Sequence, residues 1–174
     1  MHTSSYETAP LARPLANAWL YDAAGDIQEL YLYWAECRAG RVMPRRDDVD
    51  FAALVAGFPR VLLAEANAAR ETPADSYYIY RALGHEDFAY EGYVGEGLDP
   101  ALFRHIPDRG CHAATVARDV HTERVRLLSG DGLIMEYEVA FLPLGPEGGA
   151  EDAAVDGILI LAVELAPGTM AGGA

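Results

Sequence analysis

The segment Val155–Leu165, with the sequence VDGILILAVEL, constrains the fold more than any other part of the chain. From Ile158 to Val163 every residue is apolar, at odd and even positions alike. Successive side chains of a strand point to opposite faces of its sheet, so a strand with this pattern needs cover on both faces. The segment therefore predicts a strand inside a sheet and excludes an exposed edge strand.

The residues ahead of it predict an antiparallel hairpin of Val120–Leu128 and Leu133–Leu144. The loop Gly130-Asp131-Gly132 supplies glycine for positive φ. Charge selects the register, because a slip by one residue brings Glu123 opposite Glu138. In the favoured register the opposed charges are Arg126 with Glu136 and Arg124 with Glu138, which we expect to form a solvated face. The opposite, apolar face carries Val125, Leu127, Met135, Tyr137, Val139 and Phe141.

Helices and two more strands are predicted earlier in the chain. Capping residues, apolar spacing and glycine or proline breaks mark the helices. We expect them at Pro14–Ala24, at Asp26–Cys37 with a capping box of Asp26 and Glu29, at Asp50–Val55, around His85–Tyr90, at Asp99–His105, and at Asp108–Arg118 with Ala113 and Val116 on its apolar side. Strands are expected at Arg60–Ala66 and Ser76–Leu83, and a turn at Gly92–Gly97.

The order of these elements predicts a single α+β domain. The 51% of hydrophobic residues are enough for a core. We expect a flexible start and short helix over residues 1–25, the domain over 26–166, and a disordered tail over 167–174. No internal repeat is present.

Composition excludes several classes of function. The net charge of −14 gives no general attraction to nucleic acids or anionic membranes. All 13 basic residues are arginines, which excludes mechanisms that need a lysine, such as a phosphate-binding P-loop. No serine lies in a G-x-S-x-G motif, which excludes the nucleophile elbow of a serine hydrolase. Without a signal sequence or a membrane-spanning run, and with Cys37 and Cys111 far apart, we expect a cytoplasmic protein with free thiols.

Several short motifs, in their order, resemble a proteobacterial family of stand-alone PAS-like proteins. They are Leu32-Tyr33-Trp34, Pro44-Arg45-Arg46, Asp50, Tyr80-Arg81-Ala82-Leu83-Gly84, the glycines of GYVGEGL, and Leu142-Pro143-Leu144. The resemblance covers about Ile27 to Leu165. The chain departs from the family pattern in the long segment Asn67–Asp75 and in His85, which follows Gly84.

The resemblance implies a five-stranded antiparallel sheet of order 2-1-5-4-3, with short helices over one face and an N-terminal helical extension. It also implies a sensor or adaptor without an effector domain, which binds a small molecule or a partner protein in a signalling pathway. PAS domains commonly dimerise through an N-terminal helix, which suggests a homodimer here. The apolar stripe of the predicted N-terminal helix, which packs either on its own sheet or on a second subunit, consists of Ile27, Leu30, Tyr31 and Trp34.

An aromatic cluster falls where the resemblance places a ligand pocket. Aromatic walls with a few polar tips suit a small apolar or aromatic ligand, but the same residues also fill a core that holds no ligand. Arg81 would pair with an acid such as Glu86 or Asp87, or with a ligand carboxylate. The candidate ligand-binding residues are Tyr80, Arg81, His85, Phe88, Tyr90, Phe103, His121 and Tyr137.

The resemblance permits haem or flavin, and the sequence identifies neither as a cofactor. Haem needs an accessible imidazole, whereas the scattered histidines are expected to be hydrogen-bonded. Zinc is not predicted, because Cys111 and His112 would point about 100° apart on a helix and no ligand spacing joins them to His105. The alternative function is a small cystatin-like enzyme, an isomerase or dehydratase with a buried histidine–acid pair.

Overall fold

The computed structural model describes residues 20, 22–66, 78–82, 100–128, 134–150 and 153–165, and of these it gives the backbone alone at 80, 82, 100–107, 127–128 and 134–135. Its helices are α1 (Gly25–Cys37), η2 (Arg46–Asp48), α2 (Phe51–Gly57) and α4 (Pro100–Ala117). Its strands are β1 (Leu62–Ala66), β2 (Tyr78–Ala82), β3 (His121–Leu128), β4 (Ile134–Leu144) and β5 (Gly157–Leu165). None of the described helices has the length and hydropathy that a membrane crossing requires.

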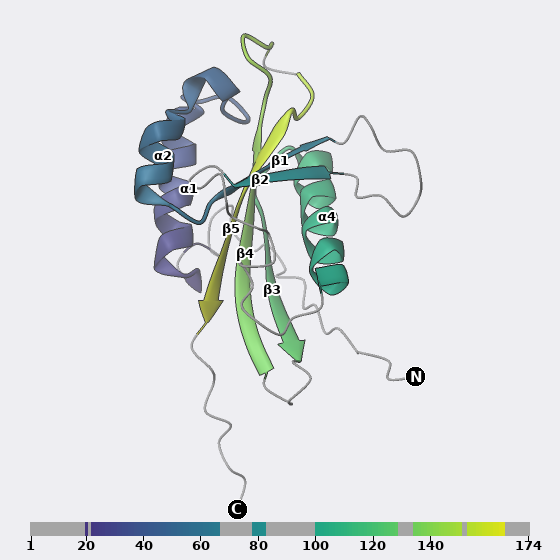
Figure 1. Cartoon of the computed structure of the whole chain (residues 1–174). Coiled ribbons are helices and arrows are strands. Elements are labelled where there is room, and N and C mark those ends of the chain that lie inside the picture. The colour runs from purple at the N-terminus through teal and green to yellow at the C-terminus, as the bar shows by residue number, and fades with distance from the viewer. Residues whose placement is uncertain are drawn as a thin grey trace, which may run out of the picture.

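The five strands form one antiparallel sheet in the order β2-β1-β5-β4-β3. This confirms the predicted α+β class and strand order. The helices α1 and α2 lie on one face of the sheet and α4 lies on the other (Figure 1). The last strand of the chain therefore sits in the third position of the sheet, between the first strand and the fourth.

Both faces of β5 are covered, as its apolar pattern predicts. Leu159 and Leu161 belong to the core under α1 and α2, whereas Ile158 and Ile160 belong to the core under α4. The pairing of β5 changes along its length. Residues 157–160 pair with both β1 and β4, but among the described strands residues 161–165 pair with β4 alone. Among the described strands, only residues 157–160 of β5 thus have a paired strand on each side.

The hairpin has the predicted register, with Arg124 opposite Glu138 and Arg126 opposite Glu136. The expectation that both pairs are solvated is wrong for one of them. Glu138 is only 3% exposed, because the start of α1 covers it, and its carboxylate accepts a hydrogen bond from the Ala24 N–H. This partner is 114 residues away in sequence, so local patterning gives no sign of it.

The apolar stripe of α1 packs against its own sheet. Ile27, Leu30, Tyr31 and Trp34 are all buried in the core that α1 shares with β4 and β5. The Trp34 indole Nε1–H donates to the Pro143 carbonyl at 2.8 Å, which fixes the helix on β4. These four side chains are not on the surface, so a subunit interface, which stays a prediction, would have to use other residues.

Of the two predicted helix N-caps, the one of α2 is confirmed and the one of α1 is wrong. The N-cap of α1 is Ala24, which makes no side-chain cap, and Asp26 lies inside the first turn, so the predicted capping box is wrong. The N-cap of α2 is Asp50, as predicted, and its carboxylate accepts from the Ala53 N–H at 3.0 Å. The helix predicted at Pro14–Ala24 falls almost wholly outside the described residues.

The helix α4 corrects two expectations. Pro107 suggests a break between two helices because proline lacks an N–H, but the structure has one continuous helix from Pro100 to Ala117. The predicted apolar side is also wrong, since Val116 is 72% exposed. The side that faces the sheet carries small residues instead, namely Gly110, Cys111 and Ala114. Small side chains let α4 approach the sheet closely.

Candidate functional site

The face of the sheet under α4 brings together two of the predicted ligand-binding residues. Tyr137 lies opposite Val125 and His121 lies opposite Phe141 in the β3–β4 pairing. Val125, Tyr137 and Phe141 all belong to the core under α4, so His121 faces the same layer. We take this α4-facing side of β3 and β4, with the facing side of α4, as the candidate site.

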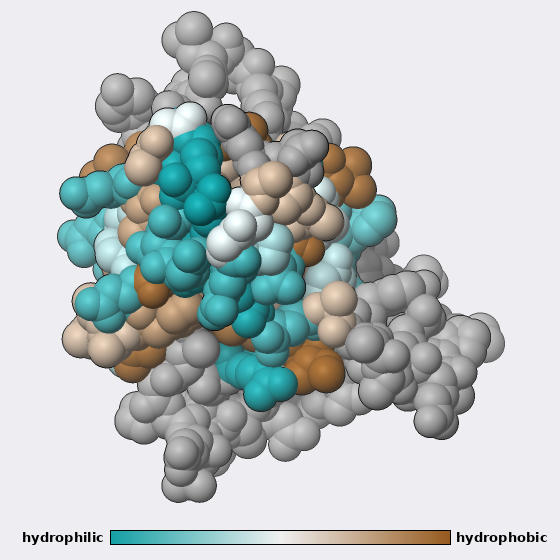
Figure 2. Space-filling model, turned by 90° about the horizontal axis from the view of Figure 1, so that it is seen from above, coloured by the Kyte–Doolittle hydropathy of each residue, from teal (hydrophilic) through white to brown (hydrophobic). Residues whose placement is uncertain are grey.

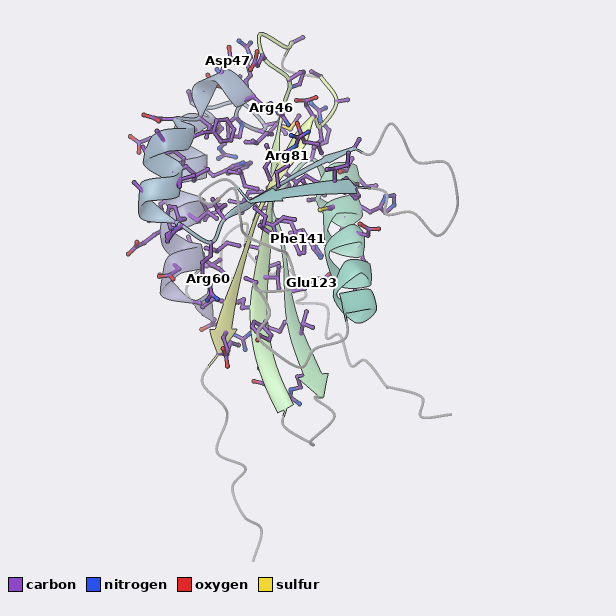
Figure 3. All side chains as sticks on the ribbon, in the orientation of Figure 1. Arg46, Asp47, Arg60, Arg81, Glu123 and Phe141 are labelled. Atoms are coloured by element: carbon purple, nitrogen blue, oxygen red, sulfur yellow. The ribbon has the colours of Figure 1, made fainter. Side chains whose placement is uncertain are left out.

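Phe141 fills the centre of this layer (Figure 3). A Cβ atom added to Gly110 would lie closer than 3.0 Å to three ring carbons of Phe141, so the ring rests directly on the backbone of α4. The imidazole of His121 lies beside the ring, with 5.9 Å between the ring centroids. A ligand therefore has no space between Gly110 and Phe141, and it would have to bind elsewhere along the layer.

A polar cluster of His121, Glu123 and Arg109 joins β3 to α4 at the margin of the site. The His121 Nε2 lies 2.9 Å from the Glu123 Oε1. Arg109 donates to both carboxylate oxygens, through Nε at 3.2 Å and through a terminal nitrogen at 2.5 Å. Burial raises the pKa of the Glu123 carboxyl, whose side chain is 11% exposed, but the hydrogen bonds of His121 and Arg109 outweigh it and leave this pKa below its ordinary value. Glu123 is thus held as a carboxylate.

Two phenols contribute further polar groups to the same layer. Thr115 donates its hydroxyl proton to the Cys111 carbonyl at 2.8 Å, so Tyr78 is the donor in its 3.4 Å hydrogen bond to Thr115. Burial is the main cause that raises the pKa of Tyr78, and also the main cause that raises the pKa of Tyr137. Both phenols are therefore protonated near neutral pH, and the Tyr78 proton is donated to Thr115.

Arg81 lies on the opposite face from these residues. It pairs with Leu63, which belongs to the core under α1, whereas its neighbour Tyr80 pairs with Ala64, which belongs to the core under α4. Adjacent residues of a strand cannot both face one pocket. The Arg81 side chain is 63% exposed and its Nε lies 2.6 Å from the Glu65 Oε2. Arg81 is therefore not part of the candidate site.

That ion pair belongs to a network at one end of the sheet. The guanidinium of Arg46 lies 2.6 Å from the Glu65 Oε1 and 2.7 Å from the Asp156 Oδ2. The hydrogen bond from Arg46 is the main cause that lowers the pKa of Glu65. Gly157 leaves the space that the guanidinium occupies. Figure 2, which looks down on this end of the molecule, shows hydrophilic side chains gathered across the middle of the described surface. With every described carboxylate of the network facing an arginine, its role is to tie the η2 segment to β1 and β5.

The side chains of the remaining predicted residues lie outside the described part of the structure. His85, Phe88 and Tyr90 are outside it altogether, as are the acids Glu86 and Asp87, and only the backbone is described at Tyr80 and Phe103. Arg109, Glu123 and Thr115 were not among the predicted site residues. Glu123 could have been found from the alternation of β3, which places it on the face of Val125, but no local pattern indicates the contribution from α4.

The described residues provide hydrogen-bonding groups and no cluster for metal binding. No group of three or more histidine, cysteine, aspartate or glutamate side chains with ligand geometry occurs among them. His121 already uses its Nε2 for Glu123, so a haem iron at that nitrogen would displace the contact. Phenol and imidazole groups set among apolar side chains are the kind of lining that small-molecule sites have.

The comparisons with known proteins add no family to this description. No family model, no curated protein and no solved structure matches the chain.

Proposed function

We propose that the protein is a single-domain sensor or adaptor of the PAS-like type. The observation that carries the proposal is the sheet order β2-β1-β5-β4-β3, in which the final strand lies inside the sheet and a separate helix covers one face. The short motifs that resemble PAS-like proteins occur along the same chain. Because one fold serves many functions, the fold supports the class of protein and the site has to support the ligand.

The chemistry of the α4-facing layer favours a small apolar or aromatic ligand. Its described walls are apolar. The polar groups described in or beside it are the Tyr78 and Tyr137 phenols, of which Tyr78 donates to Thr115, and the hydrogen-bonded cluster of His121, Glu123 and Arg109 at the margin. Walls of this kind suit a largely apolar or aromatic ligand that makes few hydrogen bonds. Arg81 does not face this layer, so a ligand carboxylate would have no contact with it. The sensor would then act on a partner protein, with a homodimer as its expected state.

The purified full-length protein provides a direct test. Native mass spectrometry and an absorbance spectrum would reveal a co-purified metabolite, haem or flavin, and light scattering would give the oligomeric state. We expect a bound small molecule that is depleted in Tyr137→Phe, and retained in Tyr33→Phe, a change on the other side of the sheet. A monomer without bound molecule, whose melting temperature no small aromatic compound raises, would contradict the proposal.

One observation favours a second candidate, an isomerase or dehydratase. The 2.9 Å contact of His121 with Glu123 is a histidine–acid pair at the margin of the layer. In that role the imidazole would transfer the proton, and the ionised Glu123 would orient it. Proton exchange of enolisable ketones and enoyl thioesters in deuterated water, followed by NMR, would detect such catalysis. Activity that is lost in His121→Ala would establish the enzyme, and the same low rate in both proteins would count against it.

A further inference from the structure

Two side chains of the β3–β4 hairpin hold the backbone that leads into α1. The Glu138 Oε2 accepts a hydrogen bond from the Ala24 N–H at 2.7 Å. A terminal nitrogen of Arg124 donates to the Asp22 carbonyl at 3.2 Å. Arg124 and Glu138 are directly opposite each other across the two strands, and the Arg124 Nε lies 3.8 Å from the Glu138 Oε1. Together they bind one donor and one acceptor of the same short backbone segment.

Glu138 is an unusual residue to find at this place. It is the one charged residue that is buried in the described part of the chain. A buried carboxylate needs compensating partners, since removing it from water is unfavourable. Here the partners are the Ala24 N–H and the positive end of the α1 dipole. Ala24 is the N-cap of α1 and has no side-chain oxygen, so Glu138 supplies the cap from the sheet.

Within the described part of the chain, the other hydrogen bonds of the segment 22–24 are local ones. The Gln28 side-chain amide donates to the Ala23 carbonyl at 2.7 Å, and the Ala23 N–H donates to the Leu20 carbonyl at 3.3 Å. Asp22 is exposed and Ala24 is half-buried, and Ala23 contributes a single buried methyl group to the core. The rest of α1 is fixed independently, because Ile27, Leu30 and Trp34 are buried against the sheet. Releasing the segment would therefore expose little apolar surface and would leave the helix docked.

We propose that Arg124 and Glu138 form a latch that docks the start of α1 and opens without unfolding the domain. The latch is a conformational device, in which polar groups of the hairpin set the position of the chain entering the helix. It requires two states of residues 22–24, docked and released, and a sheet that is the same in both. The proposal concerns these contacts alone and does not depend on a ligand.

Hydrogen exchange of backbone amides, measured by NMR, tests the latch on the full chain. Glu138→Gln removes the charge and keeps the size, and Glu136→Gln is the matched control on the same strand face. Glu138 accepts from the Ala24 N–H, and the Gln28 N–H donates to the Ala24 carbonyl in the first turn of the helix. Hydrogen bonds to charged groups are strong enough that we expect about tenfold faster exchange at the Ala24 and Gln28 amides in Glu138→Gln. Exchange in β4 and β5 should stay unchanged, and Glu136→Gln should match the native protein. Equal acceleration throughout the sheet, or none at the Ala24 and Gln28 amides, would overturn the proposal.

A second variant acts on the other partner of the same bond. Ala24→Pro deletes the N–H, and the φ of −56° at Ala24 already suits proline. We expect it to accelerate exchange at the Gln28 amide as Glu138→Gln does, and the double variant to exchange no faster there than the faster single variant. Effects that multiply in the double variant would show that the two changes act independently, which the latch does not allow.

Discussion

At the scale of single residues, Gly110 sets the distance between α4 and the sheet. It is the point where the helix backbone meets the ring of Phe141, a fully buried side chain of the central region of β4. A glycine inside a helix is normally unfavourable, by about 1 kcal/mol relative to alanine. Its presence here is explained by the close approach, since no other side chain fits between the helix and the ring.

We predict that Gly110→Ala destabilises the protein despite the better helix propensity of alanine. The new methyl group would lie closer than 3.0 Å to three ring carbons, so Phe141 or α4 must move, and the overpacking cost falls at the upper end of the usual range, about 2–3 kcal/mol. The gain of about 1 kcal/mol in helix propensity leaves a net loss of roughly 1–2 kcal/mol. Urea unfolding measures it. Gly25→Ala is the control, because a Cβ at Gly25 meets nothing within 4 Å. Equal stability of Gly110→Ala and the native protein would show that the close contact is absent.

Glu123 carries a pH-dependent contribution to stability. Its pKa in the folded protein lies below the ordinary value of 4.5, so the carboxylate stabilises the fold above about that pH. The contribution is lost as the pH falls through the folded-state pKa. We predict that Glu123→Gln is less stable than the native protein by about 1–2 kcal/mol at pH 7, because charged hydrogen bonds are lost, and that the difference shrinks toward pH 3. Urea unfolding between pH 3 and 7 checks this, and a difference independent of pH would refute it.

At the scale of elements, the sequence predicts those parts whose partners are close in the chain. The hairpin register follows from two pairs of opposite charges, and α2 follows from the Asp50 cap. The start of α1 could not be predicted in the same way, since its cap comes from Glu138 on a distant strand. The continuity of α4 through Pro107 was also not predicted. Proline is a local signal for the end of a helix, and the sequence does not show the packing on the sheet that offsets it.

The attachment of α1 to β4 gives a prediction at this scale. Trp34→Phe leaves the Pro143 carbonyl without its donor and leaves a gap where the indole was, so we expect a loss of about 2–4 kcal/mol. Because Trp34 packs within its own chain, the loss should be independent of protein concentration in urea unfolding. Tyr33→Phe, a half-buried neighbour, should lose less than about 1 kcal/mol. A concentration-dependent loss would instead place Trp34 between subunits.

At the scale of the whole molecule, the doubly apolar final strand predicts the centre of the sheet, whereas the candidate site is only partly predicted. His121 and Tyr137 share a layer because both follow the alternation of one hairpin. Arg81 was predicted as a charged ligand contact alongside Tyr80, although alternation along β2 places the two residues on opposite faces. Arg109 joins the site from a helix, and such contacts depend on how α4 sits on the sheet.

The uneven pairing of β5 leads to a prediction about local stability. Residues 158–160 have hydrogen-bonded neighbours on both sides and cover on both faces, whereas residues 163–165 pair only with β4 among the described strands. Each amide at 158–160 points to one of the two neighbouring strands and lies between covered faces, so its exchange requires an opening of the middle of the sheet, which approaches global unfolding. We therefore expect hydrogen exchange to be slowest there and to become faster toward Leu165 and in the edge strand β2. Amides of β2 that exchange as slowly as those of Leu159 and Ile160 would contradict the strand order, because an edge strand opens without disturbing the strands beyond its one neighbour.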